Sequence, residues 1–126
     1  MSMVLAVAAG GAVGAVARYL MAAGVAAWLG TAFPWGTLGV NVLGCGIMGA
    51  VAGAIAMAWA PSPELRAFLA IGVLGGFTTF SAFSFDVAAL MERNANWAAL
   101  AYVLASVVLS IAAFFVGMRL IRLALG

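Results

Sequence analysis

The sequence predicts an all-α membrane protein with four transmembrane helices, the third of them broken. Two properties of the composition predict the class: 68% of the 126 residues are hydrophobic and only 6% are charged, and the mean hydropathy is +1.29. A soluble domain carries about 25% charged residues, so this chain could not solvate a globular surface. The third observation is that four apolar stretches each reach the ~20 residues that cross the hydrocarbon core. We therefore expect a single transmembrane domain over 1–126.

Loop signals set the limits of the four spans. The first apolar run exceeds the length of a signal peptide, so it is interpreted as a retained span. Glycine, proline and polar residues separate the runs at GTAFPW, APSPE and MERNAN. The predicted spans are 3–29, 36–59, 65–90 and 97–120. An even number of spans returns the chain to the side of the membrane on which it began.

The third span contains a poor helix sequence. Gly75 and Gly76 precede two β-branched threonines, which predicts a break at this point. Non-helical backbone at membrane depth persists only where it is buried in protein or lines a cavity. A break frees carbonyl groups that can coordinate a cation, and the restarting helix offers free N–H groups.

Glycine is frequent in the predicted spans, with 16 residues in the chain. Small residues four apart let transmembrane helices pack closely. Because four spans can hardly enclose a lined pathway alone, these packing surfaces favour an oligomer. The glycine pairs at this spacing are Gly10/Gly14, Gly49/Gly53 and Gly72/Gly76.

Several polar residues lie inside the apolar spans. Arg18 lies deep in the first span, where a charge costs about 3 kcal/mol, so it faces water or a partner, or it snorkels to the interface. Asn41 either bonds a neighbouring helix or donates to an anion. Tyr102, Ser106 and Ser110 recur at i, i+4 and i+8 and share one helix face. They form a polar track unless the serines bond back to their own helix.

The stretch GGFTTFSAFSFD, residues 75–86, combines hydroxyl groups with aromatic rings. Phe80 and Phe83 lie three apart on one helical face, and the edge of a phenyl ring carries partial positive charge. Hydroxyl donors, an amide and ring edges, without Lys or His, suit a small and strongly hydrated anion that must also be released. The hydroxyls of this stretch belong to Thr78, Thr79, Ser81 and Ser84.

The remaining composition argues against other functions. The chain has no histidine, and its three acidic residues lie near predicted span ends, so neither a catalytic pair nor a proton relay can be assembled and we expect no enzymatic activity. A net charge of +2 is too small for a nucleic-acid partner. The lone Cys45 permits no intrachain disulfide.

Three motifs resemble those of the Fluc (CrcB) family of fluoride channels. They are GAVG at 11–14 with RY at 18–19, GTLGVNVLG at 36–44, and GGFTTFSAFS at 75–84. The resemblance covers all four spans in order. It implies a multi-pass protein of the cell inner membrane that exports fluoride passively. It also implies an antiparallel, dual-topology homodimer with two pores and a central structural Na+.

The resemblance also implies roles for individual residues. The Gly75 and Thr78 carbonyls would bind the sodium ion, and Arg18 would draw anions in. Ala82 departs from the family, which usually has threonine there, so one hydroxyl is absent. The residues expected along the fluoride pore are Asn41, Thr79, Phe80, Ser81, Phe83, Ser84, Tyr102, Ser106 and Ser110.

The residues also bear on two other functions and on the orientation of the chain in the membrane. A small multidrug exporter needs a membrane-embedded carboxylate, but the first span offers Arg18 instead. A structural subunit without transport would explain the glycines but not the clustered rings and hydroxyls. Three arginines on the N-terminal face against one opposite give a mild bias toward a cytoplasmic N-terminus; they are Arg66, Arg119 and Arg122, against Arg93.

Overall fold

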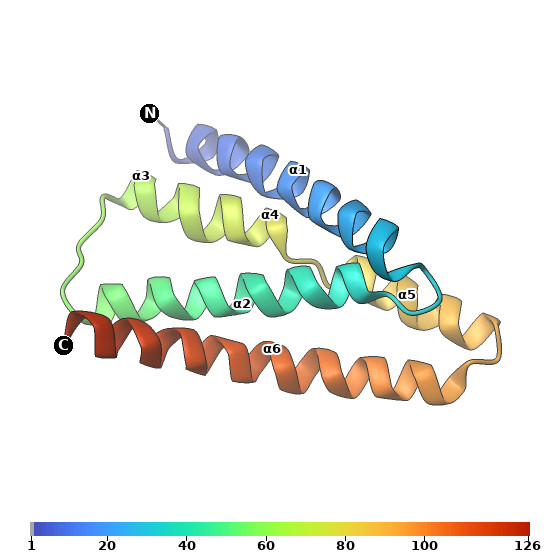
Figure 1. Cartoon of the computed structure of the whole chain (residues 1–126). Helices are drawn as coiled ribbons and strands as arrows, with labels where there is room; N and C mark the ends of the chain where they lie inside the picture. Colours follow the sequence, from blue (N-terminus) through green and yellow to red (C-terminus); the bar gives the residue numbers. More distant parts are fainter. Residues whose placement is uncertain (1) are drawn as a thin grey trace.

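The computed structural model describes residues 2–126 and consists of helices that run back and forth four times (Figure 1). Both termini lie at the same end of the bundle. The third run contains four consecutive elements, whereas each of the other runs is one helix. The elements are α1 (Met3–Leu29), α2 (Trp35–Ala56), α3 (Pro63–Arg66), η1 (Ala67–Leu74), α4 (Gly75–Phe77), α5 (Ser81–Glu92) and α6 (Asn96–Leu125).

All four runs are long and apolar enough to cross a membrane, at Met3–Leu29, Trp35–Ala56, Pro63–Glu92 and Asn96–Leu125. The prediction of four such helices is therefore confirmed. Local chemistry sets several helix ends: Ser62 Oγ accepts from the Leu65 N–H at 3.1 Å, and Pro63 follows at the first helical position. At the C-terminal end of α2, Ala58 adopts a φ of 83°, and the helix stops at Ala56, before residue 59 where the span was predicted to end.

The helical conformation of the third run stops after Phe77 and resumes at Ser81. Thr78 is extended, with φ −88° and ψ 157°, and the Ala82 N–H donates to Thr79 Oγ1 at 3.1 Å as the helix restarts. The double glycine, where the sequence predicted the break, is itself helical. The break predicted over 75–78 therefore begins only at Thr78, because Gly76 packs against α1 in helical form.

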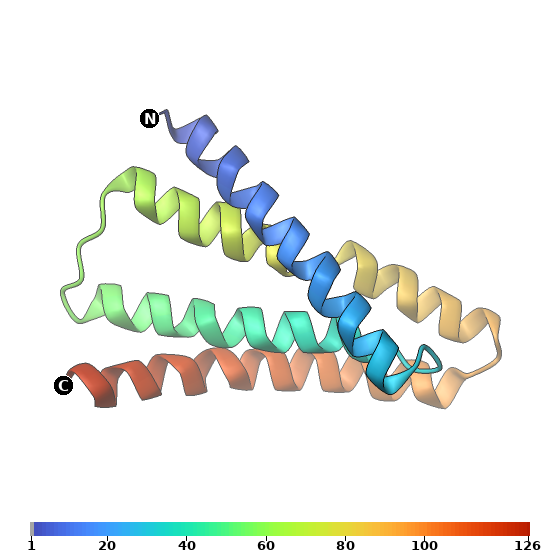
Figure 2. The same cartoon turned by 45° about the horizontal axis from the view of Figure 1, so that its top comes forward.

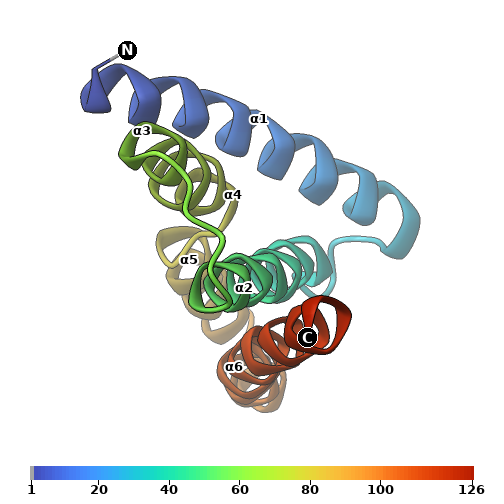
Figure 3. The same cartoon turned by 90° about the vertical axis from the view of Figure 1, so that its left-hand side faces the viewer.

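Close glycine contacts hold two pairs of helices together. At Gly76 an added Cβ would lie 2.8 Å from the Gly11 carbonyl oxygen, and at Gly72 it would lie 2.7 Å from Gly10 Cα. Figure 2 shows α1 crossing the third run obliquely. Gly49 meets the backbone of Phe114 in the same manner, and Figure 3 shows α2 between the third run and α6.

The glycine pairs are thus used inside one subunit. The expectation of close helix packing at these glycines is confirmed, because each pair packs against another helix of the same chain, and the oligomer that they favoured stays a prediction. A buried cluster lies where α2, α5 and α6 meet. It contains Leu38, Phe83, Leu90, Ala99 and Tyr102.

Large apolar side chains cover much of the surface. They include Trp28, 82% exposed, and Ile71, 62% exposed. A soluble monomer rarely exposes apolar surface on this scale. These side chains are placed to face lipid or a second subunit.

Candidate functional site

Asn41 of α2 holds the non-helical segment of the third run. Its Nδ2 donates to the Thr79 carbonyl at 3.0 Å, and its Oδ1 accepts from the Thr79 N–H at 2.7 Å. This reciprocal pair satisfies the backbone of a residue outside the helices, inside an apolar bundle. One amide hydrogen of Asn41 is used, and the second N–H remains available to another acceptor.

Arg18 of α1 binds the helical turn that precedes this segment. Its Nε donates to the Gly76 carbonyl at 3.1 Å, and the side chain is half-buried. The arginine is therefore bound to protein at the depth of the interruption. A separate hollow of about 280 Å³ lies beside it, with Thr37, Thr79 and Ala82 in its lining.

A cavity of about 280 Å³ opens beside the interruption, between α2, α5 and α6. It gathers six residues that the sequence placed along the pore: Asn41, Thr79, Phe80, Phe83, Ser106 and Ser110. The rest of its lining is Cys45, Thr78, Val107 and Ile111. The lining holds no charged side chain, so it combines neutral donors with apolar and aromatic surface.

Two hydroxyl groups of this cavity are buried without a partner. Neither Ser106 Oγ nor Ser110 Oγ has a hydrogen bond to any residue that the structure describes. The alternative that these serines bond back to their own helix is therefore not what the structure shows. A buried polar group left unpaired costs about 1–3 kcal/mol. Two such groups in one cavity indicate a ligand or water that this chain does not itself provide.

The two phenylalanines differ in exposure although their rings touch. Their ring centroids lie 5.3 Å apart with planes inclined at 52°. Phe83 is 8% exposed and packs on the Tyr102 ring at 5.1 Å, whereas Phe80 is 77% exposed. One ring is thus fixed in the core, and the other projects from the subunit at the edge of the cavity.

Comparison with known proteins identifies the family. A family model described as "CrcB-like protein, Camphor Resistance (CrcB)" matches residues 5–118. The chain belongs to the CrcB family. This confirms the resemblance seen in the three motifs.

The CrcB chain is also similar to curated proteins along nearly its whole length. A protein of Rhodospirillum centenum named "Fluoride-specific ion channel FluC" is 62% identical over 98% of both chains. A protein with the same name from Chelativorans sp. is 59% identical over 90% of both chains. Another, from Nitrobacter winogradskyi, is 50% identical over 94% of both chains.

Three predicted pore residues of this CrcB chain do not line the cavity of one subunit. The Tyr102 hydroxyl donates to Asp86 Oδ2 at 3.0 Å. Ser84 Oγ donates to the Phe80 carbonyl of its own helix at 3.1 Å. Ser81 Oγ lies 3.4 Å from Thr79 Oγ1. Their roles in a pore stay predictions.

Sequence reasoning missed two residues at or near this site. Cys45 lines the cavity, and its position four residues after Asn41 on a helix could have indicated this. Asp86 lies near a predicted span end, yet it accepts a hydrogen bond from the Tyr102 hydroxyl inside the bundle. The signal available was its place at the end of the hydroxyl-rich stretch.

The carbonyls of Gly75 and Thr78, which are expected to bind sodium, do not sit in the hydrogen-bonding pattern of a continuous helix. In a continuous α-helix the Thr79 N–H would bond the Gly75 carbonyl, but here it donates to Asn41. Thr78 is extended, so its carbonyl leaves the helix axis, and its hydroxyl is used on the Leu74 carbonyl at 2.9 Å. Gly75 is exposed on the subunit surface. The donor set fits a hard cation bound through backbone oxygens.

Proposed function

We propose that this CrcB chain is a fluoride-selective ion channel that exports fluoride passively across the inner membrane. The observation that carries the proposal is the pair of unpartnered hydroxyls, Ser106 and Ser110, in a neutral cavity beside the interrupted third run. The names of the curated relatives support the choice of fluoride over other anions.

The chemistry of the cavity suits a small anion. The serine hydroxyls and the free N–H of Asn41 replace water around the ion, and ring edges of Phe80 and Phe83 add partial positive charge. Because the lining has no charged group, the ion is bound weakly enough to leave again. Arg18, which is tied to the Gly76 carbonyl, adds positive potential near the interruption without entering the cavity.

The working unit is proposed to be an antiparallel homodimer. Phe80 projects from the subunit with 77% exposure, and Gly75 lies on the surface nearby. A second copy packed over this surface would bury the ring and close the open side of the cavity. Twofold symmetry then gives two equivalent pores, one for each cavity. The arginines at the helix ends bias the orientation only mildly, which is compatible with insertion both ways.

A structural Na+ is proposed at the centre of that dimer. The Gly75 and Thr78 carbonyls of each subunit would hold it, because neither is engaged as in a continuous helix. When bound, the ion would supply a fixed positive charge and a link between the subunits. The chain's own part is to position this backbone: Asn41 binds Thr79 in the non-helical segment, and Arg18 binds the Gly76 carbonyl of the preceding helical turn.

Fluoride efflux from liposomes that contain only this protein tests the proposal. We expect efflux that follows the fluoride gradient and the membrane potential and is unchanged by an imposed proton gradient. Efflux that requires a proton gradient would show a coupled exporter and overturn the passive mechanism. Liposomes with the Asn41→Leu variant provide the control, because that variant loses the hydrogen bonds that hold Thr79.

A further inference from the structure

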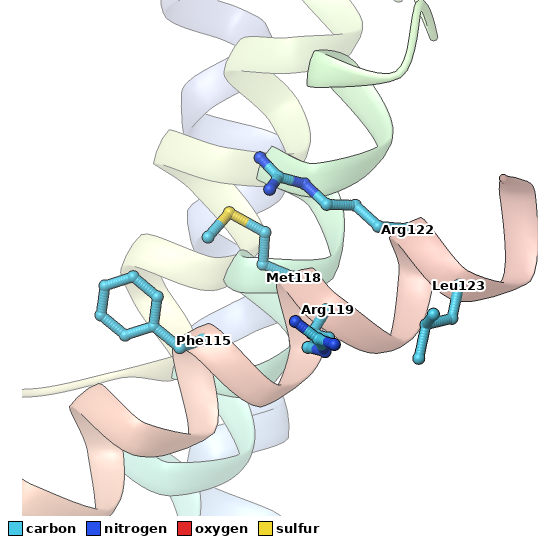
Figure 4. Close-up of a pocket in the computed structure, with 5 residues that line it drawn as sticks. All are labelled: Phe115, Met118, Arg119, Arg122 and Leu123. Carbon is cyan, nitrogen blue, oxygen red and sulfur yellow. The ribbon is translucent and has the colours of Figure 1, made fainter.

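A further hollow, of about 510 Å³, lies near the C-terminal end of α6, away from the candidate pore. Its lining joins two arginines to three apolar side chains: Phe115, Met118, Arg119, Arg122 and Leu123. Figure 4 shows all five carried by α6, with Met118 and Arg122 extending on the same side of the helix. We call this hollow the α6 C-terminal site.

The two arginines of the α6 C-terminal site differ from those with a structural role. Arg18 and Arg93 each donate to a backbone carbonyl, of Gly76 and Ala32. Arg119 and Arg122 are exposed and make no hydrogen bond or ion pair with the residues that the structure describes. Two uncompensated charges on adjacent turns indicate an anionic partner.

The length of α6 places this site at the membrane surface. The helix has 30 residues, or about 45 Å at about 1.5 Å per residue, against a hydrocarbon core of about 30 Å. Trp97 is 83% exposed at the start of α6, where a tryptophan marks an interface. A core that begins there ends about 20 residues later, so Arg119 and Arg122 fall at the depth of lipid headgroups.

We propose that the α6 C-terminal site binds an anionic phospholipid through its phosphate. Guanidinium groups pair with phosphate oxygens in a planar fork, which favours arginine over lysine at such sites. Phe115 lies on the side toward the hydrocarbon core, where it contacts the acyl chain. A free phosphate ion would satisfy the arginines but leave the apolar half of the hollow uncovered, and we therefore assign the site to a lipid. The inference does not depend on which ion the protein conducts.

Unfolding midpoints of the purified full chain in detergent test this site. We compare added phosphatidylglycerol, phosphatidylcholine and inorganic phosphate for the wild type and for Arg119→Gln/Arg122→Gln. The wild type should bind phosphatidylglycerol in preference to phosphatidylcholine. The apparent affinity should fall about fivefold for each arginine removed, as expected for basic residues near an anionic surface. Arg66→Gln removes an exposed charge at the same end of the bundle and should change nothing.

Four outcomes would overturn the proposal. The double variant could keep the preference for phosphatidylglycerol, or Arg66→Gln could reduce it equally, which would show diffuse charge attraction. Inorganic phosphate could stabilise the wild type as well as the lipid does, which would show a free-anion site. The double variant could also lower ion flux in vesicles of phosphatidylcholine alone, which would assign the arginines to the conducted ion. If the double variant does not fold, the single variants Arg119→Gln and Arg122→Gln give the same comparison.

Discussion

Removing the unpartnered hydroxyls should stabilise the protein while it disables conduction. In Ser106→Ala and Ser110→Ala, no hydrogen bond within the subunit is lost, because neither Oγ has a partner among the described residues. Each substitution removes a buried unpaired group that costs about 1–3 kcal/mol. We therefore expect the unfolding free energy in fluoride-free detergent to rise by about 1 kcal/mol for each change.

The same substitutions should weaken the interaction with fluoride. A hydrogen bond to a charged group contributes about 1.5–3 kcal/mol, and each 1.4 kcal/mol corresponds to about a factor of ten. Fluoride efflux from liposomes should thus fall at least about tenfold for each serine. Ser62→Ala is the matched control, because it removes the cap that accepts from Leu65 at 3.1 Å, far from the cavity. It should lose about 1 kcal/mol of stability and conduct normally.

Both substitutions should raise the unfolding free energy and lower fluoride efflux, so the two measurements together give a strict test. If Ser106→Ala and Ser110→Ala lower stability and leave efflux intact, the hydroxyls are structural and the cavity is not the pore. A loss of both stability and efflux would show that the serines have partners within the folded assembly, and the reasoning from unpaired groups would fail.

Three further predictions address the rings, the interruption and the assembly. Phe80→Ile and Phe83→Ile should each cut fluoride efflux heavily while the dimer persists on size-exclusion chromatography, and normal efflux in both would make the rings packing only. A Cβ at Gly75 would meet nothing nearer than 3.5 Å within the subunit, so Gly75→Val should fold yet fail to dimerise. By contrast, Gly76→Ala places its Cβ 2.8 Å from α1 and should impair folding itself, which circular dichroism and thermal melting would show. With Cys45 replaced, a single cysteine at either terminus should be labelled from both sides of the membrane, and one-sided labelling would exclude dual topology.

The helices and the family followed from the sequence because both depend on local patterns. Apolar length predicted four spanning helices, and three motifs predicted the CrcB family. The spacing of Ser106 and Ser110 correctly placed both on one helix face, and both line the cavity. Such inferences need only the period of a helix.

The details that the sequence could not locate depend on contacts between helices. The interruption falls at 78–80 for two reasons. The first is that α1 packs on Gly76 in helical form, and the second is that the Asn41 side chain hydrogen-bonds the backbone N–H and carbonyl of Thr79. Neither contact can be inferred from a single span. The Tyr102 hydroxyl turns to Asp86 instead of the cavity for the same reason. The positions of the sodium carbonyls and of Arg18 relative to a pore stay predictions.

The most direct test of the central claim compares fluoride with chloride in one preparation. Liposomes reconstituted with this protein alone are loaded with potassium fluoride or potassium chloride, and efflux is started with a potassium ionophore. We expect rapid fluoride efflux, and chloride efflux no faster than from protein-free liposomes. Chloride efflux as fast as fluoride efflux would contradict it, because a cavity of neutral donors around a small anion would then provide no selectivity.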